Sequence, residues 1–290
     1  MTTEIEAMLN EDERTDAINL ALDTIGLRHV SASQISQYQR CPRQWAYRQV
    51  LHLKVPPDGG LVRGSGVHHA AEVGMLHKMA TGENPEPEMA ATAAAEYVTE
   101  QCKSGEIVLS DGQTQGHITD DAVRIAEAWA TEAAPLVDPV AVEERFDVLM
   151  HGIQVTGRLD VVTSGSVVDW KTSGKSPNRD DVVKAMQTSL YARATGKPVQ
   201  YVYLVNQVKG VKVVDVPVSE DESRQAAALA DSTVADVAQG MALGVWPRNR
   251  TGWHCSKRWC GYYERCMAGR DDAELMDRAA DARGAAGVMW

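Results

Sequence analysis

One short stretch in the second half of the chain constrains the fold more than any other feature. Two runs rich in β-branched residues flank Ser164–Gly165, a dipeptide suited to a two-residue hairpin turn. A turn there places Asp160 directly opposite Asp169, with Cβ atoms roughly 5 Å apart. Lys171 follows two residues after Asp169 and therefore lies on the same face of the sheet. The hairpin thus predicts two carboxylates and an amine at one place.

Carboxylates opposed on neighbouring strands repel each other, and this costs stability unless a cation lies between them. Hard oxygen ligands favour Mg²⁺ or Mn²⁺, and Lys171 beside such an ion could orient a water or hold a phosphoryl oxygen. The alternative is a solvated face on which the three side chains have no shared role. Burial of this face would count against the alternative, because carboxylates are not buried without cations.

Other polar side chains are spaced one helical turn apart. His68 and Glu72 share a face of the helix expected after Gly64, and a neutral imidazole at His68 could add a third metal ligand. Gln187 and Tyr191 form a similar pair on a later predicted helix. Both pairs fit a centre built around the hairpin.

The periodicity of the remaining sequence predicts an α/β protein. Helices are expected at about 65–80, 88–102, 119–134, 180–195 and 219–243, the last opened by a capping box. A further helix is expected over about 33–48, with Ser33 as its N-cap and a break at Cys41-Pro42. Strands are expected at about 140–150, 153–163, 167–171, 199–206 and 211–218. This order indicates an α/β core with helical additions at both ends.

Net charge alone argues against a nucleic-acid partner, because the 290 residues sum to −11. The acids gather at the two ends, however, while basic residues gather at 40–63, 171–212 and 248–270. Two interpretations stay open. The surface is an ordinary mixture of charges, or it has an anion-binding face that the negative net charge of the whole chain conceals. The N-terminus is acidic where a signal peptide would be basic, and no apolar run is long enough for a membrane span. We therefore expect a cytoplasmic protein without membrane contact.

Four of the five cysteines are candidates for a metal site. Cys255, Cys260 and Cys266 lie within twelve residues among basic side chains, and Cys41 precedes Pro42 far upstream. Four thiolates suit either zinc or an iron–sulfur cluster, and their spacing does not distinguish these. Cys102 stands apart in a predicted helix and is expected to be a core residue.

Taken together, the motifs resemble the RecB-like branch of the PD-(D/E)XK nucleases, in particular CRISPR-associated and phage-encoded exonucleases with an iron–sulfur cluster. The resemblance runs from Ser33 to about Met267. It rests on an ordered set of motifs: Ser33-x-x-Ser36 with Tyr38 and Cys41-Pro42, Gly64-x-x-x-His68-x-x-x-Glu72, Gly157-x-Leu159-Asp160, Asp169-Trp170-Lys171, Gln187-x-x-x-Tyr191 and the cysteine trio.

The resemblance implies roles for matching residues. His68, Asp160, Asp169 and the backbone carbonyl of Trp170 would bind the catalytic Mg²⁺ or Mn²⁺, and Lys171 would be the catalytic lysine. Gln187 and Tyr191 would support the site and touch DNA. A [4Fe–4S] cluster, with zinc as the alternative, would be held by Cys41, Cys255, Cys260 and Cys266. The gap between Cys255 and Cys260 is longer than is usual in the family.

The resemblance also implies a restriction-endonuclease-like core, a central mixed sheet flanked by helices. It divides the chain into an acidic helical lead-in (1–32), a nuclease domain (33–267) and an acidic tail (268–290). Within the nuclease domain we expect a helical insertion at about 83–135 and a Cys-rich region at 246–267.

The implied activity is metal-dependent exonucleolytic hydrolysis of DNA, on single strands or ends. Recombination, repair and spacer processing all stay open as pathways, with helicase, recombination or spacer-acquisition proteins as partners beside DNA. One rival is a non-catalytic DNA-binding adaptor, and another is an electron-transfer protein. Five aromatic residues either stack on unpaired bases or pack in the core: Tyr38, Trp45, Tyr47, Trp253 and Trp259.

Overall fold

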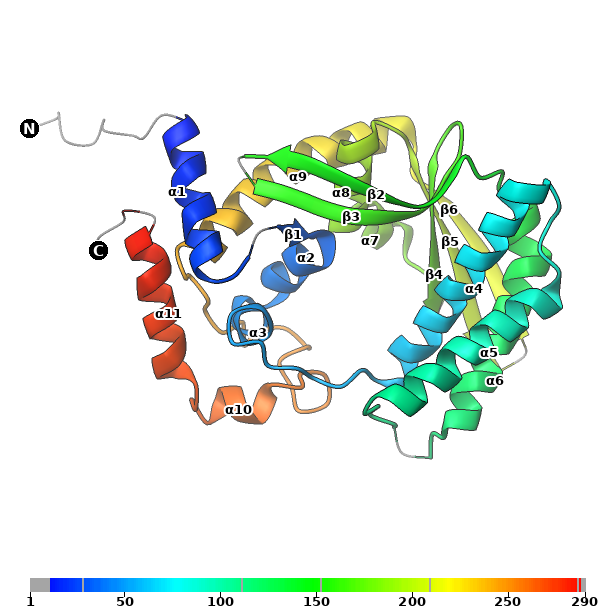
Figure 1. Ribbon diagram of the computed structural model, residues 1–290, viewed down its shortest axis with the longest axis horizontal. Coiled ribbons are helices and arrows are strands. Elements are labelled where there is room, and N and C mark those ends of the chain that lie inside the picture. The colour runs from blue at the N-terminus through cyan, green and yellow to red at the C-terminus, as the bar shows by residue number, and fades with distance from the viewer. Residues whose placement is uncertain are drawn as a thin grey trace, which may run out of the picture. The chain divides into compact units, whose positions relative to one another are not determined.

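The computed structural model describes residues 11–27, 29–110, 112–151, 153–208, 210–285 and 287 (Figure 1). The first ten residues of the predicted acidic lead-in and the last three of the predicted acidic tail lie outside this range. Within it, no helix is both long and apolar enough to cross a bilayer.

The chain forms two compact units. The first comprises the chain up to Val55, the segment Asp147–Gly157 and the chain from Ala228 onward. The second comprises Pro56–Phe146 and Arg158–Ala227.

Six strands form one mixed sheet, which confirms the predicted architecture. They are β1 (Val30–Ser31), β2 (Ala141–Met150), β3 (Ile153–Val162), β4 (Val167–Ser173), β5 (Val199–Gln207) and β6 (Gly210–Pro217). Their order is β1-β3-β4-β5-β6, and β2 pairs with β3. Strand β4 is antiparallel to β3 and parallel to β5, while β6 is antiparallel to β5.

Helices make up most of the remaining described chain. They are α1 (Glu11–Thr24), α2 (Ala32–Arg40), α3 (Pro42–Gln49), α4 (Gly59–Thr81), α5 (Pro87–Ser104), α6 (Gln115–Ala128), α7 (Arg179–Val183), α8 (Met186–Thr195), α9 (Glu220–Ala242), α10 (Tyr263–Met267) and α11 (Asp272–Ala285). A π-helical turn (Trp129–Ala133) and a 3₁₀ turn (Ala134–Leu136) continue α6.

Two local predictions were wrong. The N-cap of α2 is Ser31 rather than Ser33, because Ser31 and Gln34 form a reciprocal capping box. The helix expected over 180–195 is divided into α7 and α8, since Ala185 adopts an extended backbone (φ −65°, ψ 138°). The Thr188 hydroxyl lies 2.6 Å from the Val182 carbonyl oxygen and ties the two helices together.

In the second unit, helices α4, α5 and α6 pack together beside β4 and β5 (Figure 1). The close packing depends on glycine, because a Cβ on Gly74 of α4 would lie 2.7 Å from the Trp129 ring. Trp129 is fully buried and meets Trp170 of β4 edge-on, with ring centroids 5.7 Å apart. This apolar contact holds one face of β4 against the helices. The opposite face of the strand is left for polar residues.

The first unit has its own core. Helices α1 and α11, from opposite ends of the chain, lie side by side (Figure 1). Trp45 of α3 is fully buried between Tyr38 and Trp246, with ring centroids 5.5 Å and 6.2 Å away. The Tyr38 hydroxyl donates to the Val245 carbonyl oxygen. Aromatic packing thus joins α2 and α3 to the segment after α9.

Candidate active site

The hairpin has the register that its turn predicts. Val161 pairs with Val168 and Val162 with Val167, and Thr163 N–H donates to the Ser166 carbonyl oxygen. One further step in this register brings Asp160 level with Asp169. There the regular pairing gives way to a side-chain contact, because Trp170 N–H donates to Asp160 Oδ2 over 2.9 Å.

Successive side chains of β4 point to opposite faces of the sheet. Trp170 packs into the apolar core, whereas Asp169 and Lys171 lie on the opposite face. Asp169 is fully buried, yet its Oδ2 lies only 2.5 Å from Lys171 Nζ. The burial of Asp169 counts against the alternative of an ordinary solvated face.

His68 reaches this face from α4. A Cβ on Gly64, one turn earlier, would lie 3.0 Å from Thr172 Oγ1, so glycine lets α4 come close to β4. His68 Nδ1 then lies 3.2 Å from Asp160 Oδ2. Burial by itself would lower the pKa of His68, but the contact with Asp160 outweighs it and the net direction is upward.

A hydrogen-bond network joins Lys171 to α8. Lys171 Nζ donates to Gln187 Oε1 (2.9 Å), and Gln187 Nε2 donates to Asp169 Oδ1 (2.8 Å). The Tyr191 hydroxyl accepts from Gln187 Nε2 (2.6 Å) and lies 2.8 Å from the Arg158 carbonyl oxygen. Gln187 and Tyr191 therefore hold the lysine and the carboxylate in place, as expected for a pair one turn apart.

Asp169 is under electrostatic strain. Burial, with repulsion from Asp160, raises the pKa of Asp169 to about 6, although Lys171 opposes the shift. Its Oδ2 has no hydrogen bond of good geometry despite the short distance to Lys171, because distance alone does not make a hydrogen bond. This buried carboxylate oxygen therefore lacks a satisfied partner, which a cation could supply.

Sequence reasoning missed Glu143. This residue of β2 lines a cleft of about 600 Å³ together with His68, Glu72 and Lys171. Its backbone has a positive φ of 51°, which is unusual for a non-glycine residue. Burial and the nearby Asp160 and Glu72 raise the pKa of Glu143, and Arg158 Nη1 lies 3.4 Å from its Oε2. Only the pairing of β2 with β3 brings it here, so no local pattern would have revealed it.

His69 and Glu72 line the same cleft, but among the described residues no hydrogen bond or ion pair joins either of them to Asp160 or Asp169. His69 Nδ1 lies 3.4 Å from Glu72 Oε2, and its ring lies 5.3 Å from that of Tyr97. The predicted grouping of His68 with Glu72 is therefore divided. His68 faces Asp160, while Glu72 pairs with His69.

The donor set fits a divalent cation chemically. Two carboxylates and an imidazole, with the Trp170 carbonyl on the strand between Asp169 and Lys171, are ligands that Mg²⁺ or Mn²⁺ accepts. As the side chains stand, however, no three His, Cys, Asp or Glu residues in the described chain form a group that could hold a metal ion. The carboxylates are instead turned toward protein donors, Asp160 to Trp170 N–H and Asp169 to Lys171.

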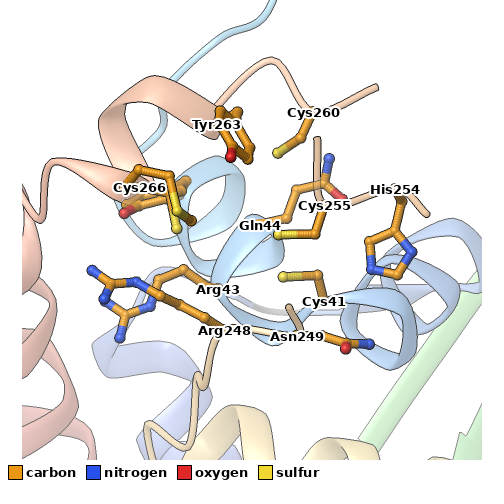
Figure 2. A pocket seen from close by; sticks show the side chains of 12 residues that line it. Cys41, Arg43, Gln44, Arg248, Asn249, His254, Cys255, Cys260, Tyr263 and Cys266 are labelled. Atoms are coloured by element: carbon orange, nitrogen blue, oxygen red, sulfur yellow. The ribbon is translucent and has the colours of Figure 1, made fainter. Parts of the chain in front are cut away.

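The four predicted cysteine ligands line one small pocket of the first unit (Figure 2). Cys41 is the N-cap of α3, Cys266 belongs to α10, and Cys255 and Cys260 lie in the loop between α9 and α10. Burial and the other three thiols raise the pKa of Cys260. Cys102 lies elsewhere, on α5, partly buried against the core of the second unit. The four thiols are of a type that soft metals accept, and His254 also lines the pocket, but as the side chains stand they form no metal-holding group within the described residues.

Protein contacts alone bring these distant cysteines together. Arg43 Nε donates to the Trp246 carbonyl oxygen (2.9 Å), and Asn249 Nδ2 donates to the Arg40 carbonyl oxygen (2.9 Å). The Tyr262 hydroxyl donates to the Leu53 carbonyl oxygen over 2.7 Å. Each bond spans more than 200 positions of sequence. The pocket is thus part of the fold of the first unit.

Comparison with known proteins agrees with this geometry. Residues 29–267 match the PD-(D/E)XK nuclease superfamily. This chain belongs to that superfamily. Its mixed sheet flanked by helices is the restriction-endonuclease-like fold that the sequence predicts. Members of the superfamily typically use divalent metals such as Mg²⁺, and the family assignment supports nuclease activity.

One solved structure shares the fold. A protein from Eubacterium rectale described as "Putative exonuclease" aligns with a TM-score of 0.55 and 11% identity, covering 88% of this chain and 92% of its own. The structure of SSO0001 aligns with a TM-score of 0.39 and 13% identity, covering 91% of this chain and 98% of its own. No curated protein matches the sequence.

Proposed function

We propose that the protein is a metal-dependent DNA exonuclease of the RecB-like branch, acting on single strands or on DNA ends. The observation that carries the proposal is the fully buried Asp169 with Lys171 Nζ 2.5 Å from its Oδ2, beside Asp160 and His68. A fully buried carboxylate whose lysine partner lines an open cleft is costly to keep for stability alone. A buried carboxylate with a raised pKa, as at Asp169, is typical of catalytic sites.

His68, Asp160, Asp169 and the Trp170 carbonyl would hold a Mg²⁺ or Mn²⁺ ion. The bound ion would supply Lewis-acid activation of water and neutralise charge that develops on the phosphate. Lys171 would hold the attacking water or a phosphate oxygen with its ammonium group. Gln187 and Tyr191 would act as positioning residues, because they bond Lys171 and Asp169 from α8.

We further propose that Cys41, Cys255, Cys260 and Cys266 bind a [4Fe–4S] cluster, with zinc as the alternative. The support for this proposal is that four thiols from distant segments line one pocket. Two buried nitrogens at this pocket, Arg248 Nε and His254 Nε2, also have no hydrogen-bond partner among the described residues. A metal centre with its bound sulfur atoms would place polar atoms beside these two nitrogens.

The decisive experiment is digestion of end-labelled linear DNA with Mg²⁺ or Mn²⁺. We expect Lys171→Ala and Asp160→Asn to lower the cleavage rate by about 100-fold or more, because the first removes charge stabilisation at the reacting phosphate and the second removes a ligand of the metal ion. Lys103→Ala, an exposed lysine at the end of α5, is the matched control and should cleave normally. Circular single-stranded DNA should resist if the enzyme needs an end.

The rival function is a DNA-binding adaptor that does not cut. It predicts wild-type protein that binds DNA but leaves labelled ends intact with every divalent metal tested. Full nuclease activity in Lys171→Ala would also contradict the proposed site, whatever the substrate.

A further inference from the structure

The five aromatic residues considered above separate into two groups in the structure. Tyr38, Trp45 and Tyr47 are buried in the first unit and serve its core. Trp253 and Trp259 are 73% and 56% exposed. Large aromatic side chains are rarely left this exposed without a partner, because their burial is strongly favourable.

The two exposed tryptophans lie against each other on one loop of the first unit. Their ring centroids are 5.6 Å apart and their planes are at 90°. Rings at this angle do not cover each other's faces as parallel rings would, so flat aromatic surface remains open to a planar partner. The loop has local hydrogen-bonded turns around the pair, since Cys255 N–H donates to the Gly252 carbonyl oxygen and Cys260 N–H to that of Ser256.

The charge around this pair indicates the class of partner. The segment 250–263 carries Arg250, Lys257 and Arg258, and the acidic residue that follows it, Glu264, pairs with Lys257 (2.5 Å) and leaves the two arginines as its cations. The Arg258 guanidinium lies 4.9 Å from the centroid of the Trp259 ring, and no acidic partner of Arg258 occurs within the described part of the chain. A cation held on an aromatic ring combines a stacking surface with a phosphate-binding group.

We propose that Trp253, Trp259 and Arg258 form a binding platform for an unpaired base and its phosphate in single-stranded DNA. The inference rests on the proposed nuclease function for its choice of DNA, and it adds a substrate-binding site on the first unit. Stacking tolerates every base because every base has a flat π-face. The platform therefore favours unpaired strands without reading sequence.

The test compares two oligonucleotides with equal numbers of phosphates. One is short oligothymidylate, and the other is the same length of abasic sugar–phosphate units. Binding is measured by fluorescence anisotropy with full-length protein and no added divalent cation, so that cleavage plays no part. We expect Trp253→Ala and Trp259→Ala each to raise the Kd for oligothymidylate about 5-fold or more, while the Kd for the abasic strand stays within about twofold.

Control variants separate stacking from folding. Trp253→Phe keeps an aromatic face and should retain most of the affinity. Met276→Ala removes an apolar side chain that is 64% exposed on α11 and should change neither Kd. Because both tryptophans are exposed, the melting temperature of each alanine variant should match that of the wild type.

Three results would overturn the platform. Equal weakening of both oligonucleotides would indicate a charge or folding effect, and unchanged binding of oligothymidylate would show that the tryptophans do not contact it. A wild-type dimer that dissociates in Trp253→Ala without a change in oligonucleotide affinity would assign the surface to a second copy of the chain. None of these results depends on Lys171, so a failed platform and a failed nuclease assignment remain distinguishable.

Discussion

At the scale of single residues, Asp169 shows how the site stores electrostatic energy. Its carboxylate is fully buried between Lys171 and the network on α8, close to a second carboxylate at Asp160. Burial and this repulsion raise the pKa of Asp169 to about 6. A protein built only for stability would avoid such a group.

Asp169 should therefore make the metal-free protein less stable as pH rises. Folding favours its protonated form, so its stabilising contribution is full below the unfolded pKa near 4 and is lost as pH rises through about 6. Between pH 4 and pH 7.5 the wild type should lose about 2–3 kcal/mol relative to Asp169→Asn. Urea unfolding at both pH values without metal measures this difference, and parallel pH profiles would contradict the shift.

Glu143 lines the cleft without belonging to any motif. Glu143→Gln should lower kcat/KM by about 10-fold, because the loss of a charged group beside metal ligands typically has an effect of that size. Glu144→Gln on the same strand is the matched control, since Glu144 is exposed. Steady-state digestion of labelled DNA by both variants tests the assignment, and equal rates would remove Glu143 from the site.

At the scale of elements, helix α4 carries His68 to β4 by means of two glycines. Gly64 allows the approach to Thr172, and Gly74 allows contact with Trp129. Glycine within a helix costs roughly 1 kcal/mol relative to alanine, so close packing has to outweigh this preference.

Gly74→Ala should therefore destabilise the protein despite its better helix propensity. Its new Cβ would lie 2.7 Å from the rigid Trp129 ring, and overpacking of this kind costs about 1–3 kcal/mol. Gly116→Ala on α6 is the control, because its Cβ would meet only Thr114 Oγ1 at an ordinary 3.6 Å. Thermal unfolding of both variants gives the comparison. A Gly74→Ala protein as stable as the control would show that α4 can shift without cost.

At the scale of the whole molecule, the cysteine pocket joins segments that are far apart in sequence. Cys41 precedes Cys255 by 214 positions, and hydrogen bonds such as that from Arg43 to Trp246 already link their segments. A bound metal would add to this closure by offsetting the entropy of a long loop.

Cys260→Ser should remove both colour and stability. Purified without air, the wild type should be brown and contain iron and acid-labile sulfide, whereas Cys260→Ser should be colourless and poorly soluble. Cys102→Ser is the matched control and should keep the colour, because Cys102 packs against the core of the second unit. Metal and sulfide analysis with absorption spectra checks this. A colourless wild type that binds one zinc ion would show that the site holds zinc instead of an iron–sulfur cluster. A Cys260→Ser variant with the colour, metal content and melting temperature of the wild type would exclude a metal site there.

Local sequence information predicted those features that depend on neighbours in the chain. The turn at Ser164–Gly165 determines the hairpin register, since pairing of Val161 with Val168 follows from turn geometry alone. Helical spacing likewise placed Gln187 and Tyr191 on one face of α8, and β-branched runs predicted the strands. Local errors arose where competing caps were available, as at Ser31 and Ser33.

Only the tertiary structure decided which distant residues share a site. Glu143 reaches the cleft through the pairing of β2 with β3, and Glu72 turns to His69 instead of the carboxylates. The fate of the tryptophans was equally undecided in the sequence, because Trp45 and Trp253 have the same apolar surface to bury. Trp45 finds Tyr38 and Trp246 around it, while Trp253 lies on a loop that leaves it exposed. Burial depends on contacts between distant segments, and a local pattern does not contain them.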